Sequence, residues 1–400
     1  MDMEDRMDTR LLHTPEGVRD YYNEDCISKQ ELLKRIHTVQ RSFGYHDIQT
    51  PTFEFFDIFS REVGTTQSKD LYKFFDREGN TLVLRPDFTP SIARCAAKYF
   101  LEDAHPVRLC YSGSTFINES AAYRGRLKET TQIGVEFIGD AAVTADAEIL
   151  ALAVESLLAS GLTKFQVEVG QVEFFKGLLE EAGLSDDEGE QLRQRISEKN
   201  FFGVDELLEK KDLSDGQRRM FQKLTQTFGG IELIEEAKSW TKNTRAIQAI
   251  ERLEAIYACL KEYGCEQYIS FDLGMLSKYQ YYTGIIFRAY TYGTGEAIVT
   301  GGRYDSLMHY FGKEAPAVGF VVLADQLMNA LNRQNISMSA AEPETVVLYD
   351  DGDFQRALQT AGNLRREGIC VELIRRTSLD DERYYQTLGR KLVVIGKDNT

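Results

Sequence analysis

The residues with the clearest chemical potential lie between Thr130 and Ile138, where polar or small residues alternate with apolar ones. Successive side chains of a strand point to opposite faces, so this pattern predicts that Gln132 and Glu136 share one face. A carboxylate and an amide on one sheet face are a common way of building a small polar pocket. The alternative is a solvated face of an antiparallel sheet, which has the same pattern.

A second pair of polar groups precedes a predicted helix. The segment LRPDFTPSIARCAAKYF runs from a strand into a helix, with Pro90 near the first turn, where its missing N–H costs little. Asp87 and Thr89 come just before the helical pattern. Their side chains could cap the helix, which is a purely structural role, or serve a binding site.

Composition places the chain among soluble globular proteins. It has 400 residues, 42% of them apolar and 28% charged, which is enough for two or three domains with a sizeable core. The 47 basic and 63 acidic residues give a formal charge of −16, which argues against a broad basic surface for nucleic acid. The N-terminus MDMEDRMDTRLL has no apolar signal core, so we expect a cytoplasmic protein.

No pattern for a metal or a nucleotide cofactor is readable. The six cysteines are scattered without CxxC spacing, and the five histidines form neither HxxxH nor HExxH. The chain has no P-loop and no GxGxxG, and Gly301-Gly302 is better explained by close backbone packing than by phosphate binding. We therefore expect neither a metal nor a cofactor.

The order of the predicted elements indicates an α+β fold. Strand patterns predominate in the first part, and the tail alternates strand, helix, strand, weak helix and strand, which is a small parallel α/β unit. The segment between them is helical and charged. We predict a core formed by residues 1–170 and 265–335, a helical insertion domain over 171–264, and the α/β unit over 343–400.

Seven segments together resemble the class II aminoacyl-tRNA synthetases, and among them the histidyl-tRNA synthetases. They are TPEGVRDY, FGYHDIQTPTFE (motif 1), LRPDFT, the hairpin TFINE…QIGVEF (motif 2), YYTGIIF, GGRYD and AVGFVV (motif 3). The resemblance covers nearly the whole chain. It implies an antiparallel sheet of about six or seven strands flanked by helices, and self-association as a dimer through motif 1.

The departures from the synthetase pattern fall on the residues that handle ATP. The family's motif 2 arginine is replaced by Ile117 and its motif 3 arginine by Gln326. A third arginine is replaced by Ser277, and the acidic residue before the paired tyrosines is Gln280. Arginine is a fixed fork of donors suited to phosphate, so the loss of three such residues leaves little basis for forming an adenylate.

The amino-acid pocket, in contrast, keeps its polar residues. By resemblance, Asp87, Thr89 and Gln132 would hold the α-ammonium group of histidine. Glu136 and one of Tyr281 and Tyr282 would hold the imidazole. The usual carboxylate partner is missing at Ser277, and Arg124, Arg126 or a backbone N–H is expected to replace it. The predicted histidine-binding residues are Asp87, Thr89, Gln132, Glu136, Tyr281, Tyr282 and Arg126.

One known family combines a histidine pocket with a lost ATP site: the regulatory subunits of ATP phosphoribosyltransferase. This resemblance implies a chain without catalysis of its own, which pairs with the short-form catalytic subunit in the first step of histidine biosynthesis. It also implies feedback inhibition by L-histidine. The tail resembles the start of an anticodon-binding domain but ends at IGKDNT, so we do not expect tRNA recognition. The alternatives are a divergent histidyl-tRNA synthetase and a free-standing histidine sensor.

Overall fold

The structure is a computed structural model that describes residues 12–59, 66–100, 105–118, 127–211, 213–276, 282–338, 344–378 and 380–396. The chain divides into two compact units, residues 1–338 and 339–400. No helix in the described ranges is both long and apolar enough to cross a membrane.

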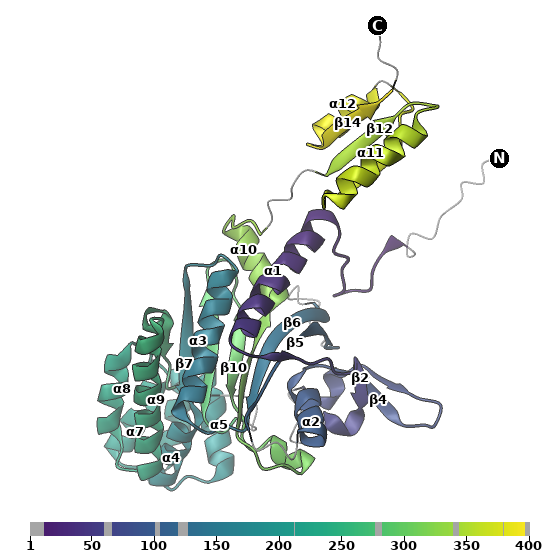
Figure 1. The fold of residues 1–400 in the computed structure, drawn as a ribbon. Coiled ribbons are helices and arrows are strands. Elements are labelled where there is room, and N and C mark those ends of the chain that lie inside the picture. The colour runs from purple at the N-terminus through teal and green to yellow at the C-terminus, as the bar shows by residue number, and fades with distance from the viewer. Residues whose placement is uncertain are drawn as a thin grey trace, which may run out of the picture. The chain divides into compact units, whose positions relative to one another are not determined.

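The first unit is built on an eight-stranded sheet with the order β1-β5-β6-β11-β10-β9-β7-β8 (Figure 1). Its strands are β1 (His46–Asp47), β5 (Val107–Phe116), β6 (Glu129–Ile138), β7 (Phe165–Gln171), β8 (Ile269–Phe271), β9 (Ile285–Thr291), β10 (Val299–Arg303) and β11 (Ala317–Leu323).

The central strands of this sheet are antiparallel, as expected, but the two edges are not. β1 pairs with β5 in parallel, and β8 pairs with β7 in parallel. The expected count of six or seven strands was therefore too low, and the sheet is mixed. The extra strands are two and three residues long, too short for an alternating pattern to show in the sequence.

The hairpin of β5 and β6 pairs in register from Val107 opposite Ile138 to Phe116 opposite Glu129. The predicted alternation along β6 is confirmed. Ile133, Val135 and Phe137 are buried in the main hydrophobic core, whereas Gln132 and Glu136 face the other side of the sheet. The two faces of β6 thus separate packing from chemistry.

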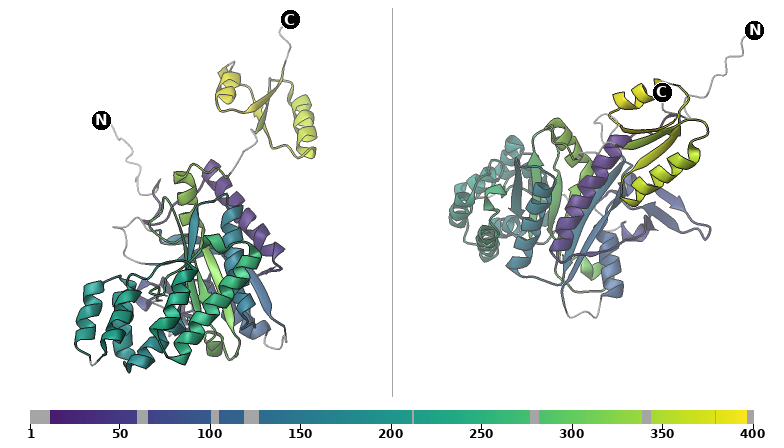
Figure 2. Two further views of the ribbon diagram at one scale, coloured as in Figure 1. Left: turned by 90° about the vertical axis from the view of Figure 1, so that its left-hand side faces the viewer. Right: turned by 45° about the horizontal axis from the view of Figure 1, so that its top comes forward.

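Helices cover the core face of the sheet. α1 (Asn23–Ser42), α3 (Val143–Ala159) and α9 (Thr244–Tyr263) pack with one another and with the strands, as Figures 1 and 2 show. α2 (Thr89–Tyr99) lies on the opposite face, where its alanines contact residues around Tyr304 and Met308. α10 (Ala324–Arg333) follows β11 directly. The short 3-10 turns are η2 (Phe56–Ile58), η3 (Ser68–Asp70), η5 (Lys238–Trp240), η6 (Glu266–Tyr268) and η7 (Met308–Phe311).

The segment expected to be helical, 171–264, does form helices. They are α4 (Val172–Ala182), α5 (Asp186–Ser197), α6 (Phe201–Glu209), α7 (Asp215–Leu224), α8 (Ile231–Ala237) and α9. Capping boxes of Ser185 with Glu188 and Ser214 with Gln217 begin α5 and α7. The apolar faces of these helices join the same hydrophobic core as the sheet. Their status as a separate insertion domain stays a prediction.

A second, three-stranded antiparallel sheet is formed by residues between β1 and β5. Its strands, in spatial order, are β2 (Phe53–Phe55), β4 (Thr81–Leu84) and β3 (Lys73–Phe75). The hairpin predicted from residues 71–84 is its β3–β4 pair. One face packs around Phe59, Leu71 and Val83. Phe53, Phe55, Phe74 and Phe75 are exposed.

The second unit is the predicted βαβαβ arrangement. It consists of β12 (Thr345–Tyr349), α11 (Phe354–Arg366), β13 (Val371–Arg375), α12 (Asp380–Thr387) and β14 (Lys391–Ile395). Both β13 and β14 pair in parallel with the central β12. Val347, Ala357, Ala361 and Val371 form a small core of their own.

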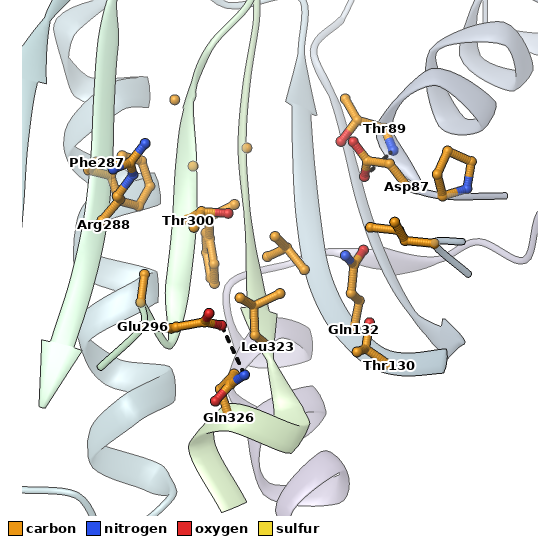
Figure 3. A pocket seen from close by; sticks show the side chains of 18 of the residues that line it. Asp87, Thr89, Thr130, Gln132, Phe287, Arg288, Glu296, Thr300, Leu323 and Gln326 are labelled. Atoms are coloured by element: carbon orange, nitrogen blue, oxygen red, sulfur yellow. Dashed lines mark hydrogen bonds between the residues drawn. The ribbon is translucent and has the colours of Figure 1, made fainter. Parts of the chain in front are cut away.

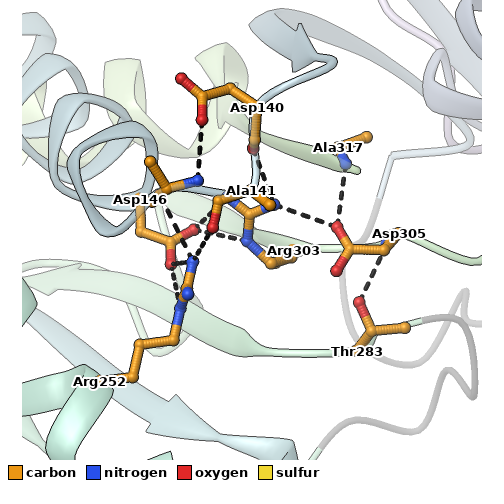
Figure 4. Close-up of polar contacts among 9 residues, drawn as sticks. Asp140, Ala141, Asp146, Arg252, Thr283, Arg303, Asp305 and Ala317 are labelled. Atoms are coloured by element: carbon orange, nitrogen blue, oxygen red, sulfur yellow. Dashed lines mark hydrogen bonds and ion pairs between the residues drawn. The ribbon is translucent and has the colours of Figure 1, made fainter. Parts of the chain in front are cut away.

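A buried ionic network fastens the helical segment to the sheet (Figure 4). Asp146 on α3 is fully buried and pairs with Arg303 on β10 at 2.7 Å and with Arg252 on α9 at 2.6 Å. Arg303 also donates to Asp305 and to the carbonyl of Asp140, both at 3.1 Å. One carboxylate therefore holds two arginines from elements far apart in the sequence.

Removal of this carboxylate should destabilise the first unit strongly. Asp146→Ala leaves the buried Arg303 with only the part-exposed Asp305 as a counter-charge, and breaking a buried pair from one side costs about 3–5 kcal/mol. Urea denaturation followed by circular dichroism measures the loss. The matched control is Glu206→Ala, whose ion pair with Lys210 is largely exposed and contributes at most about 1 kcal/mol. Equal effects of the two variants would contradict the role assigned to Asp146.

Candidate functional site

A cavity of about 540 Å³ opens on the face of the main sheet opposite α1 and α3 (Figure 3). Its floor is formed by β6, β11, β10 and β9, and its wall by the turn that leads into α2. This volume is in the range typical of small-molecule sites. The strand register places three rows of side chains on the floor, one at Glu136, one at Gly134 and one at Gln132.

Glycines give the floor its depth. In the register, Gly319 lies opposite Glu136 and Gly302 lies opposite Gly319. A Cβ added to Gly319 would overlap the Glu136 carboxylate and would lie 2.5 Å from the carbonyl of Val135. A Cβ on Gly134 would lie 2.5 Å from the Tyr111 hydroxyl. These contacts are shorter than real Cβ contacts, so only glycine leaves room for the polar groups.

Glu136 is the most buried polar group of the cavity, with 1% of its surface exposed. It accepts a hydrogen bond from the Thr89 hydroxyl at 2.7 Å and another from the Tyr304 hydroxyl. Burial raises the pKa of Glu136 to about 8, and the two hydroxyl donors oppose that rise. The carboxyl group therefore exchanges its proton near neutral pH and can either donate to or accept from an imidazole.

A set of acceptors lies beside Glu136. The Asp87 carboxylate accepts from the backbone N–H of Thr89 at 3.3 Å. The side-chain oxygen of Gln132 is buried and has no hydrogen-bond partner among the described residues. A buried acceptor without a donor is costly, so this oxygen is suited to a ligand that supplies an N–H. An ammonium group would meet that need.

The part of the cavity farther from Asp87 has different chemistry. Arg288 and Thr300 stand opposite each other on β9 and β10. The Gln326 amide donates to Glu296 at 3.1 Å, as the dashed line in Figure 3 marks. Ile117 also lines the cavity, but on the Asp87 side, where it follows β5. The two positions at which the sequence analysis noted lost arginines, Ile117 and Gln326, thus face the cavity with an alkyl group and an amide already engaged with Glu296.

The structure brings together five of the seven predicted binding residues. Asp87, Thr89, Gln132, Glu136 and Tyr282 all line the cavity. Tyr281 and Arg126 lie outside the described residues. Thr89 does not cap the helix, because its hydroxyl bonds to Glu136. The Asp87 carboxylate does accept from the first backbone N–H of α2, at Thr89, so it has a structural contact as well as its place in the cavity.

Sequence reasoning missed two tyrosines of the cavity. Tyr304 donates to Glu136 and is fully buried, and Tyr111 lies beneath Gly134. Tyr304 belongs to GGRYD, a segment that the sequence analysis singled out without assigning it a role. The alternation of a strand could have identified it. Neighbouring residues face opposite sides, so Tyr304 faces the cavity if Arg303 faces the core.

A second cluster outside the cavity could hold a metal ion by geometry. The ligand atoms of His37, Asp47 and Cys110 lie within 4.8 Å of one another. In the structure His37 and Asp47 bond to each other at 2.5 Å, and Arg41 lies 3.6 Å from Asp47. Burial raises the pKa of the Cys110 thiol to about 12, which keeps it protonated. The cluster is accounted for by these contacts, and we assign no function to it.

Known proteins resemble this chain along nearly its whole length. The family model described as histidyl-tRNA synthetase matches residues 17–327. The ATP phosphoribosyltransferase regulatory subunit of Acetivibrio thermocellus is 40% identical over 97% of this chain and 94% of its own length. That of Ruminiclostridium cellulolyticum is 39% identical over 97% and 93%. The chain belongs to the ATP phosphoribosyltransferase regulatory subunit family. Members of this family share the histidyl-tRNA synthetase-like fold, and their name indicates a regulatory role.

Solved structures place the fold in the same family. A structure described as an ATP phosphoribosyltransferase regulatory subunit/histidyl-tRNA synthetase from Bacillus halodurans C has a TM-score of 0.88 and 30% identity, covering 97% of this chain and 99% of its own. The histidyl-tRNA synthetase of Nostoc sp. PCC 7120 has a TM-score of 0.82 at 19% identity, covering 96% and 92%. The second likeness concerns the fold alone. Both support the predicted class II synthetase-like α+β architecture.

The raised pKa of Glu136 predicts a pH-dependent stability. The folded chain binds this proton more tightly than the unfolded chain, whose glutamates have the ordinary value of 4.5. The associated stability is present in full below that value and is lost as the pH rises toward about 8. Chemical denaturation at pH 5 and at a pH above 8 gives the free energy of unfolding at each pH. Between the two, this free energy should fall more for the native chain than for Glu136→Gln. Parallel curves for the two proteins would contradict the assignment.

Proposed function

We propose that this chain is a non-catalytic regulatory subunit that binds L-histidine in the cavity around Glu136. It would serve the short-form catalytic subunit of ATP phosphoribosyltransferase in the first step of histidine biosynthesis. All chemistry would reside on that partner. The observation that carries the proposal is the pairing of an amino-acid-like pocket with the absence of arginine at positions 117 and 326.

The polar groups of the cavity match the groups of histidine one by one. Asp87 and the unpartnered oxygen of Gln132 suit an ammonium group. Glu136 and the Tyr304 hydroxyl suit the two ring nitrogens, because each can accept or donate according to where the proton lies. Tyr282 lies against Gly302, with its ring carbons 2.6 Å from where a Cβ would stand, and closes this end. Tyr281 and Arg126 belong to the same proposal.

Adenylation of the bound amino acid is disfavoured by the residues that stand at positions 117 and 326. An adenylating enzyme must stabilise negative charge on the reacting phosphorus, and donors aimed at that charge are worth several kcal/mol. Ile117 supplies no donor, and the Gln326 amide is engaged by Glu296. The carboxylate of Glu296 would repel a phosphate rather than bind it. These features support regulation over catalysis.

Feedback inhibition would follow from linkage. Histidine shifts the assembly toward an inhibited state only to the extent that it binds that state more tightly, with a coupling of about 1–3 kcal/mol in typical systems. Reciprocity then requires the catalytic partner's activity state to change histidine affinity by the same factor in binding free energy. The Lys128 N–H, at the edge of the cavity, donates to the Gly17 carbonyl at 2.7 Å and so ties the N-terminal segment to the cavity lining.

Self-association through motif 1 is part of the proposal. The segment contains β1 and β2, and the neighbouring sheet β2–β4–β3 exposes Phe53 (51%), Phe55 (55%) and Phe75 (72%). Phe53 and Phe74 stack edge to face across this surface, 5.8 Å between ring centroids. A group of exposed aromatic rings on a folded sheet is typical of an interface between proteins. A second copy of the chain would cover it.

Histidine binding is tested by isothermal titration of the whole chain, with L-histidine and ATP as separate titrants. We expect histidine to bind and ATP to give no heat. Glu136→Ala should abolish histidine binding, because it removes the one carboxylate aimed at the ring. The titration is repeated with the catalytic subunit present, where histidine should also inhibit the activity of the wild-type assembly and not that of the variant. ATP binding that strengthens with histidine would contradict the proposal and favour a divergent histidyl-tRNA synthetase.

The dimer surface is tested by sedimentation velocity. The native chain should sediment as a dimer, and Phe55→Lys together with Phe75→Lys should give monomers, because two charges would have to be buried. Phe202→Lys is the matched control. Phe202 on α6 is 84% exposed and lies away from motif 1 in sequence, so this variant should stay dimeric. A native monomer, or a double variant that still dimerises, would exclude this surface.

A further inference from the structure

Arg288 on β9 is a positively charged residue of the cavity to which the proposed function assigns no role. It lines the cavity on the side away from Asp87 and Thr89 (Figure 3). It makes no hydrogen bond or ion pair with another residue of the described ranges. Its charge acts on Glu168, which stands opposite it on β7. A half-buried arginine that points to an open cavity is suited to an anionic ligand group.

The proposed ligand brings such a group. An α-amino acid carries a carboxylate beside its ammonium, and the acceptors that surround the ammonium cannot bind it. Asp87 and Glu296 would repel a carboxylate, and Glu136 already accepts hydrogen bonds from Thr89 and Tyr304. Among the described residues that line the cavity, Lys128 and Arg288 carry positive charge. Lys128 comes just before β6, where its side-chain stem packs against Gly17 and its N–H donates to the Gly17 carbonyl, so it is committed to the N-terminal segment.

The register places Arg288 at the right level of the floor. One row runs through Gly134, Val321, Thr300 and Arg288. This row lies between the row of Glu136 and the row of Gln132, and side chains two residues apart on a strand share a face. Three inter-strand spacings, about 14 Å in all, separate the backbones of β6 and β9. The Gln132 and Arg288 side chains both stand on the cavity face of the sheet, and a ligand lying between them would contact Gln132 at one end and Arg288 at the other.

We propose that Arg288 binds the α-carboxylate of the amino-acid ligand. It would take the role of the synthetase arginine that is replaced by Ser277 in this chain. Thr300, opposite Arg288, would add a hydroxyl donor. The assignment rests on the proposed function, since it names the partner of one group of the same ligand. It makes Arg288 the residue that distinguishes an amino acid from the corresponding amino alcohol, because a fork of two donors matches a carboxylate and not a hydroxyl.

The test uses isothermal titration of the whole chain with L-histidine and with L-histidinol, which has a hydroxymethyl group in place of the carboxylate. The native chain should prefer histidine. Arg288→Met should weaken histidine binding roughly 10- to 100-fold and leave histidinol binding nearly unchanged. Arg288→Lys should fall between them, because it keeps the charge without the fork. Arg219→Met, on the exposed surface of α7, is the control for loss of one positive charge and should change neither affinity.

The outcomes separate this inference from the proposed function. A native chain that binds histidine, with the same preference over histidinol in Arg288→Met, would overturn the role of Arg288 alone. The preference lost instead in Lys128→Met or Arg126→Met would assign the carboxylate to that residue. A native chain that binds neither ligand, with and without the catalytic subunit, would overturn the proposed function itself. Thermal unfolding of each variant shows that the fold is kept.

Discussion

The site depends on one constraint, which is the burial of the Glu136 carboxyl group in the middle of a sheet. A carboxylate loses its hydration there and must find donors in the protein. Thr89 and Tyr304 supply them from two separate elements, and Gly319 supplies the space. The start of α2, the end of β10 and the middle of β11 are therefore placed by the same group. The same burial raises the pKa of Glu136, because it disfavours the charged form.

The two ends of the cavity have been shaped by opposite requirements. Around Glu136 the polar groups are acidic or neutral acceptors, which fit a cationic or hydrogen-bond-donating ligand. Toward β9 the cavity has an engaged amide at Gln326 and a single arginine from the floor, and at the end of β5 it has an alkyl group at Ile117. A synthetase needs several cations in this region. The sheet that carries the cavity is unchanged by their loss, because these positions lie on the open face and not in the core.

Much of this arrangement could be predicted from the sequence. The alternation along β6 predicted the shared face of Gln132 and Glu136, and the tail's strand–helix order predicted its parallel sheet. Motif order then predicted which distant residues would meet. What could not be predicted was anything that depends on contacts without a local pattern. The edge strands β1 and β8 are too short to show a period, and Arg288 looks like any charged residue of a half-exposed strand.

The same limit applies to Asp146. In the sequence it looks like any other charged residue of the largely apolar helix α3. Only the fold shows that it holds arginines from β10 and α9. Since Arg303 adjoins Tyr304, a single strand carries the anchor of the helical segment on one face and a hydrogen-bond donor of the cavity on the other. The helical segment and the cavity therefore share a backbone element as well as a hydrophobic core.

The glycine floor has a consequence for how the chain can change over generations. Every amino acid that a single-base change can produce from a glycine codon carries a Cβ. At Gly319 that atom would collide with the Glu136 carboxylate, and at Gly134 with Tyr111. These positions have no neutral neighbour in the genetic code, so the floor cannot drift by single steps. Positions 117 and 326 face open space and are under no such restriction, so specificity can be altered at the rim while the floor stays fixed.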